Sequence, residues 1–166
     1  MLISQKMQNA INEQIGREFG AMLQYVAIAS YFAAEALPQL AAHFYRQADE
    51  EREHAMKFVH YVVDAGGRVT IPTVSGTKST FAGAEEAVKL SLDWEVEVTR
   101  QIHGLVDLAT QEKDHTTQQF LEWFVEEQLE EVSSMDQLLN VVRRAGPQLL
   151  FVEDHLARES GKAGEA

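Results

Sequence analysis

The chain has 166 residues, 14 basic and 26 acidic side chains, a formal net charge of −12 and no cysteine. A chain of this length can bury a substantial core in one domain, so we expect a single domain over residues 1–166. The lack of cysteine excludes disulfides, thiolate zinc sites and iron–sulfur clusters, and the negative charge disfavours nucleic acid as a partner. No stretch reaches the ~20 apolar residues of a membrane span, and the first residues lack the pattern of a secretory signal. A cytoplasmic protein without a membrane partner is therefore expected.

The first predicted helix covers about residues 4–37, with Ser4 suited to cap its N-terminus. Apolar residues recur at alternating spacings of four and three, which is the heptad rhythm of a bundle helix. We call such a line of core positions a seam. This seam is apolar or aromatic except for one carboxylate, and it comprises Ile11, Ile15, Glu18, Met22, Tyr25, Ala29 and Phe32.

A second helix should begin at Pro38, whose fixed φ suits a first turn, and end before the glycines at 66–67. Glu51 and His54 lie three residues apart, on one face of this helix, where both can reach a single metal ion. The seam contains these two and one further polar residue, and it reads Leu40, Phe44, Gln47, Glu51, His54, Phe58, Tyr61 and Ala65.

Residues 66–83 are rich in glycine and β-branched residues and predict a long connection. A helix of ~28 residues is ~42 Å long, and a connection of this length, when extended, reaches at most ~60 Å. The connection can therefore run the full length of a bundle, and bundles with one long crossover are known. A linker between two domains is the alternative, although neither half would close a good core alone.

The third predicted helix starts near Ala82 and fades in the polar run 111–115. One carboxylate interrupts its seam, which reads Ala84, Val88, Ser91, Glu95, Val98, Ile102, Leu105 and Ala109.

Thr116 and Gln119 form a candidate capping box for a fourth helix, which the Gly146-Pro147 pair ends. Its seam reads Leu121, Phe124, Gln128, Glu131, Met135, Leu138, Val142 and Ala145. A short fifth helix is predicted at about 148–159, followed by a loose tail, 160–166. The fold class is therefore all-α: a four-helix bundle over about 4–145, with one long crossover between helices two and three and a short fifth C-terminal helix.

All four seams are interrupted near mid-helix, so the polar groups should meet at one height in the bundle. Buried carboxylates are costly and repel one another, and one or two bound cations resolve both problems. Oxygen-rich ligation with a histidine nitrogen suits iron or manganese, and inward Glu and Glu-x-x-His pairs are typical of di-iron and di-manganese bundles. The expected ligands are Glu18, Glu51, His54, Glu95, Gln128 and Glu131.

The Glu-x-x-His spacing alone is a weak signal, because Glu112 and His115 repeat it in a polar run without a seam. We interpret that second pair as solvated loop. Glu50, Glu127 and Glu130 flank the seam ligands and form either a third, looser cation site or a solvated face.

The fourth helix lacks a second histidine, so the two metal positions should be unequal, with Glu51 as the bridge between them. Tyr25 lies two turns beyond Glu18, and Trp123 adjoins the fourth seam. Each aromatic residue has either a role near the metals, as a redox-active or supporting group, or a role in packing. Packing is favoured for Trp123, and the two roles are equally favoured for Tyr25.

Four segments in this order resemble the ferritins, and most closely the bacterial non-haem ferritins: NEQIGREFGAMLQYVAIASYF, HFYRQADEEREHAMKFVHYV, DWEVEVTRQI and FLEWFVEEQLEEV. The resemblance implies a hollow shell of 24 subunits that oxidises Fe(II) with dioxygen or peroxide and stores a ferric mineral. It implies one iron at Glu18, Glu51 and His54, and a second at Glu51 and Glu95 with Gln128 and Glu131 close by. It further implies a third iron at Glu50, Glu127 and Glu130, and it places Tyr25 beside the centre.

The chain departs from the haem-binding relatives, which carry a ligand methionine where Arg52 and Glu53 stand here, so no haem is expected. It also has Glu130 where those relatives repeat a histidine. Gln118 and Leu121 occupy the positions of the channel acids of animal ferritins. The rival hypotheses are a di-iron oxidase or oxygenase acting on an organic substrate, and a DNA-protecting mini-ferritin.

Overall fold

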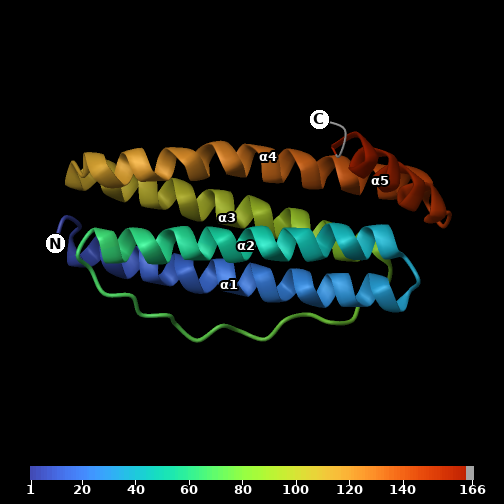
Figure 1. The fold of residues 1–166 in the computed structure, drawn as a ribbon, viewed down its shortest axis with the longest axis horizontal. Coiled ribbons are helices and arrows are strands. Elements are labelled where there is room, and N and C mark those ends of the chain that lie inside the picture. Colours follow the sequence, from blue (N-terminus) through green and yellow to red (C-terminus); the bar gives the residue numbers. More distant parts are fainter. Residues whose placement is uncertain (164–166) are drawn as a thin grey trace.

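The structure, a computed structural model, describes residues 1–163. Within these residues the chain is all-α, and the predicted fold class is confirmed. Four long helices lie side by side with a shorter fifth helix at one end (Figure 1): α1 (Gln5–Ala34), α2 (Pro38–Asp64), α3 (Ala84–Glu112), α4 (His115–Ala145) and α5 (Leu150–Ala163). None of these helices is long and apolar enough to cross a membrane.

The helices form two antiparallel hairpins, α1 with α2 and α3 with α4. Between the hairpins, the segment from Ala65 to Gly83 runs the whole length of the bundle along α1 (Figure 1). This path makes α3 parallel to α2 and confirms the crossover predicted from the length of the connection.

Buried amides of α1 hold the crossover against the bundle. Gln8 Oε1 accepts a bond of 2.9 Å from the backbone N–H of Arg68, and Asn12 Nδ2 donates one of 3.1 Å to the carbonyl of the same residue. Further along, Gln24 bonds both the N–H (2.9 Å) and the carbonyl (2.8 Å) of Lys78. The extended segment therefore has specific partners without belonging to a sheet.

Gly16 allows the closest approach of the crossover to α1. A Cβ at this position would lie 2.3 Å from Cγ of Pro72, which is far inside contact distance. The helix accepts the conformational cost of a glycine here because no larger residue leaves room for the proline ring.

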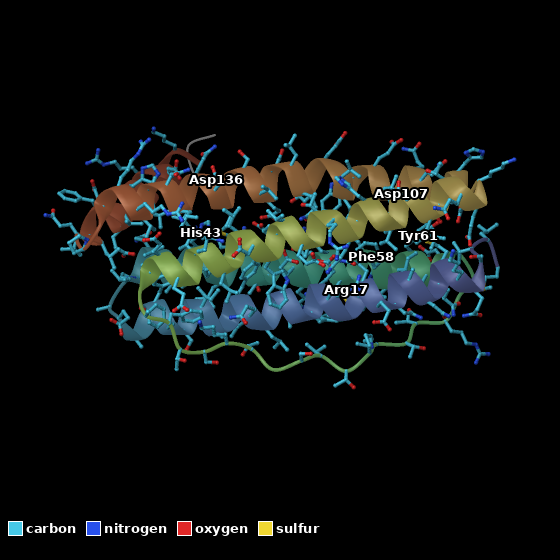
Figure 2. The ribbon with its side chains drawn as sticks, turned by 180° about the vertical axis from the view of Figure 1, so that it is seen from behind. Arg17, His43, Phe58, Tyr61, Asp107 and Asp136 are labelled. Carbon is cyan, nitrogen blue, oxygen red and sulfur yellow. The ribbon has the colours of Figure 1, made fainter. Side chains whose placement is uncertain are left out.

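The apolar core consists of two clusters, one toward each end of the bundle. Figure 2 shows Phe58 and Tyr61 toward the end that holds Asp107, and His43 toward the opposite end near Asp136. The largest fully buried side chains of the two clusters are Phe32, Phe44 and Tyr25 in one and Phe58, Phe124 and Met7 in the other. The mid-helix polar residues lie between the clusters.

Ser4 caps α1 as predicted, because its Oγ accepts a bond of 3.0 Å from the N–H of Met7. The predicted capping box of the fourth helix is wrong. Asp114 caps α4 instead, and its Oδ1 accepts a bond of 2.9 Å from the N–H of Thr117. A carboxylate is favoured at this position because it also interacts with the positive end of the helix dipole.

The short C-terminal helix begins and ends later than the predicted 148–159, because α5 spans Leu150–Ala163. The last part of the predicted tail, 164–166, lies outside the described residues. α5 is docked by its buried Val152 and Leu156. The carboxylate of Glu153 on α5 accepts bonds of 2.8 and 2.9 Å from two free N–H groups in the first turn of α2.

Candidate metal centre

The six seam residues predicted as ligands all lie in the polar layer between the two apolar clusters. Each comes from the middle of a long helix, where the heptad pattern turns it inward. All are buried: Glu18 (1% exposed), Glu51 (1%), His54 (3%), Glu95 (0%), Gln128 (2%) and Glu131 (4%). The structure therefore brings together the set that the four interrupted seams predicted, while the role of these residues as ligands stays a prediction.

The first cluster of possible ligands joins α1 and α2. Glu18, Glu51 and His54 each place one ligand atom within 4.8 Å of the others. His54 Nδ1 lies 3.6 Å from Glu51 Oε2, too far for a strong hydrogen bond. Oε2 of Glu18 and Oε2 of Glu51 are buried and no donor group of the described chain bonds them, so the two carboxyls can hydrogen-bond to each other only by sharing a proton. Buried, unpaired carboxylate oxygens are costly unless a cation or a proton is added, so their position favours a cation-binding role.

Glu95 completes the layer from α3, and two neighbours hold its carboxylate. The hydroxyl of Tyr25, which is fully buried, donates to Glu95 Oε1. Gln128 Nε2 lies 3.2 Å from Glu95 Oε2 and 3.2 Å from the hydroxyl oxygen of Thr99. Tyr25 thus contacts the centre directly through its polar end, beyond its packing in the core.

A second cluster of possible ligands links the two hairpins. His54, Glu127 and Glu131 each place one ligand atom within 4.8 Å of the others. His54 therefore faces both clusters, with Nε2 3.8 Å from Glu127 Oε1. Glu50 interacts with the carboxyl of Glu131 from the α2 side.

The three residues predicted for the outer site do not have equal surroundings. Glu50 and Glu127 are partly buried beside the second cluster, whereas Glu130 is exposed and belongs to neither cluster. Two of the three residues predicted for the outer site therefore lie beside the second cluster, while the site itself stays a prediction.

Burial makes the carboxyls of the layer hard to ionise in the absence of a cation. For Glu18 and Glu51, burial and then a neighbouring carboxylate raise the pKa well above its usual range. Burial also raises the pKa of Glu95, and burial together with Glu95 raises the pKa of Glu131 to about 9. Bound cations would replace these protons, since an opposite charge favours the ionised carboxylate.

Sequence reasoning did not identify Gln14 and Thr99, which support the ligands. Gln14 Nε2 donates a bond of 2.7 Å to Glu18 Oε1. Thr99 donates to the carbonyl of Glu95 at 2.8 Å. Gln14 lies one helical turn before Glu18 and off the seam. The signal in the sequence is an amide side chain four residues from an expected ligand.

The remaining sequence candidates lie outside the layer. Glu112 and His115 are both exposed at the facing ends of α3 and α4, and Glu112 accepts a bond from Ser4. Trp123 is 37% exposed, packs its ring 5.4 Å from the imidazole of His54 and carries the ammonium group of Lys57 over its face at 4.3 Å. Trp123 thus covers the imidazole from the outside.

A surface cavity of about 380 Å³ opens on the outer side of Trp123. Aromatic residues such as Tyr61 and Phe120 form much of its wall, and none of the expected ligands lines it. This cavity therefore does not open onto the six expected ligands.

Four helices that point carboxylates and one imidazole into a buried mid-bundle layer define the chain as a helical-bundle protein of the carboxylate metal-binding class. Comparison with known proteins agrees with this class: residues 8–145 match the family described as a ferritin-like domain. The chain belongs to the ferritin family, and this membership supports a role in iron storage.

Similar proteins cover nearly the whole chain. Ferritin BfrB of Mycolicibacterium smegmatis is 45% identical over 96% of this chain and 88% of its own length. A bacterial non-heme ferritin of Staphylococcus aureus is 37% identical over 87% of each chain. Among solved structures, an open pore ferritin from Archaeoglobus fulgidus superimposes with a TM-score of 0.90 and 38% identity, over 93% of this chain and 97% of the other.

Proposed function

We propose that this protein is an iron-storing ferroxidase, which oxidises Fe(II) to Fe(III) at a two-iron centre within one subunit and keeps the product as a ferric mineral in a hollow shell. The observation that carries the proposal is the pair of buried, unpartnered oxygens on Glu18 and Glu51, beside the imidazole of His54. Two adjacent anionic groups with a nitrogen donor bind a divalent cation through ligands that suit iron.

The residues divide between two iron positions. Glu18, Glu51 and His54 bind the first Fe(II), and Glu51 and Glu95 bind the second, with Glu51 shared. The hydroxyl of Tyr25 orients Glu95. Gln128 and Glu131 lie close to the second position. A third, looser site is formed by Glu50, Glu127 and Glu130, and the proximity of Glu127 to His54 and Glu131 supports it.

The reaction balances over one pair of irons. Each Fe(II) loses one electron, and the two electrons reduce one dioxygen, which takes up two protons and leaves as hydrogen peroxide. With hydrogen peroxide as the oxidant, the two electrons and two protons convert one peroxide molecule into two waters. The carboxylates favour the product because they stabilise Fe(III), the more highly charged ion, in a buried site. No haem takes part in this scheme.

The shell is a homo-oligomer, for which we expect 24 subunits in the cytoplasm. Relatives named as ferritins, among them one described as an open pore ferritin, support the assembly. The negative net charge of −12 suits a protein that gathers cations.

Solution mass and iron loading test the storage function together. The purified protein should have the mass of a large oligomer and take up many more than two irons per chain after aerobic addition of Fe(II). A stable monomer or dimer that never exceeds two irons per chain would exclude storage.

Single substitutions test the centre. Glu18→Ala and His54→Ala should each slow the initial oxidation of Fe(II) at least ~10-fold while leaving the assembly intact. Glu112→Ala and His115→Ala are matched controls, because they have the same spacing but are exposed away from the layer. Unchanged initial rates in both test variants would show that the centre lies elsewhere.

A further inference from the structure

Gln14 is a buried polar residue next to the centre that the ligand assignment leaves without a role. Resting on the proposed ferroxidase function, we infer that Gln14 is a positioning residue: its amide holds one oxygen of Glu18 and leaves the other oxygen as the single donor to iron.

The geometry separates the two oxygens of Glu18. Gln14 is fully buried, and its Nε2 lies 2.7 Å from Glu18 Oε1. Glu18 Oε2 is also buried but has no hydrogen-bond partner. The free oxygen belongs to the side chain that joins Glu51 and His54 in one cluster of possible ligands. One oxygen is thus engaged by the protein and the other is available.

Two charged neighbours determine which way the Gln14 amide points. Arg17 Nη1 lies 3.4 Å from Gln14 Oε1, on the opposite side of the amide from Glu18. A guanidinium can only donate, and the Glu18 carboxylate, once ionised beside a bound cation, can only accept. The amide therefore places its oxygen toward Arg17 and its NH₂ toward Glu18. Figure 2 shows Arg17 near the middle of the bundle.

The other hairpin has no equivalent of this amide. Four residues before Glu95 lies Ser91, whose hydroxyl bonds to the carbonyl of Ala87 in its own helix. Both oxygens of Glu95 instead have donors on other helices, from Tyr25 and Gln128. The first iron position is therefore the one at which the protein itself selects a single carboxylate oxygen.

A carboxylate oxygen that already accepts a hydrogen bond is a weaker metal donor than an unbonded one. Glu18 therefore offers Oε2 to a metal in preference to Oε1. Supporting hydrogen bonds of this kind affect metal affinity by about 10–100-fold when they are removed.

Co(II), which does not react with dioxygen in this setting and whose visible absorption reports its coordination, is the probe for the test. The metal-free, assembled protein is titrated with Co(II) as wild type and as Gln14→Met, a change that keeps the shape and removes the amide. We expect Gln14→Met to bind the first Co(II) about 10-fold more weakly, with an altered absorption spectrum.

Gln24→Met is the matched control, since Gln24 is a buried amide of the same helix that bonds only the crossover. Its Co(II) affinity and spectrum should equal those of wild type. Equal losses in Gln14→Met and Gln24→Met, or no loss in Gln14→Met, would overturn the inference.

A double-mutant cycle separates this inference from the proposed function. In the Glu18→Ala background, Gln14→Met should have no further effect, because the group it holds is gone. If Glu18→Ala itself leaves Co(II) binding unchanged, the ligand assignment has failed. If Glu18→Ala weakens binding and Gln14→Met does not, only the role of Gln14 has failed.

The exposed Arg17 provides a second variant should Gln14→Met not fold. Arg17→Met removes the group that orients the amide without altering the core, and it should weaken Co(II) binding about twofold to threefold, as expected for the loss of one weak hydrogen bond. Unchanged binding in Arg17→Met, with Gln14→Met unfolded, would reject the inference.

Discussion

The carboxyl of Glu131 should destabilise the metal-free protein in a way that depends on pH. Burial and Glu95 raise its pKa from 4.5 to about 9 in the folded protein. Between these two pH values the folded protein holds a proton that the unfolded chain has lost. Stability therefore falls as pH rises, by about 1.4 kcal/mol per pH unit for one group, which amounts to about 3 kcal/mol by pH 7.

Glu131→Gln removes this pH dependence, because the amide is neutral at every pH and has nearly the same shape. The metal-free variant should be more stable than wild type by up to about 3 kcal/mol at pH 7, and the gain should vanish near pH 4.5. Urea unfolding of the metal-free proteins at several pH values, followed by circular dichroism, measures the difference.

Glu130→Gln controls for the loss of one negative charge from the same helix, since Glu130 is exposed. It should shift the urea midpoint little and equally at every pH. A gain in Glu131→Gln that is the same at pH 5 and pH 7, or one that Glu130→Gln reproduces, would refute the explanation by burial.

Two other features give direct tests. Gly16→Val should cost about 1–3 kcal/mol and expose the crossover around Pro72 to limited proteolysis, because the new side chain displaces the proline ring; the same cleavage rate as in wild type would contradict the close packing. His43 is held neutral, as burial lowers its pKa from 6.5 to about 4. The unfolded chain binds a proton between these two pH values, so the free energy of unfolding falls as pH drops from 6.5 to 4. His43→Phe should reduce this loss of stability by at most about 3 kcal/mol. Identical acid-unfolding curves for His43→Phe and wild type would reject the explanation by a buried, neutral His43.

The bundle and its polar layer could be predicted because both depend on one regular pattern. A heptad seam determines which residues turn inward, so a carboxylate such as Glu95 on an apolar seam must be buried at a known height. The crossover followed from its length alone. These features need no knowledge of side-chain conformation.

The sequence did not predict features that depend on which of two nearby residues makes a hydrogen bond, or on the direction in which a side chain points. Asp114 and Thr116 can both cap a helix, and the stronger acceptor caps α4. Glu127 and Glu130 are three residues apart on the same helix, yet only Glu127 turns toward His54. The amide of Gln14 was missed because its function depends on a hydrogen bond that the seam pattern does not describe.

The two clusters of possible ligands differ in how they relate to the chain's topology. Glu18, Glu51 and His54 all belong to the first hairpin, whereas the cluster of His54, Glu127 and Glu131 needs residues from both. A cation in the first cluster could therefore bind before the hairpins have docked, while a cation in the second would act as a cross-link between them. Metal ions would then influence the last step of folding as well as the chemistry, and excess metal during refolding should accelerate the docking of the two halves.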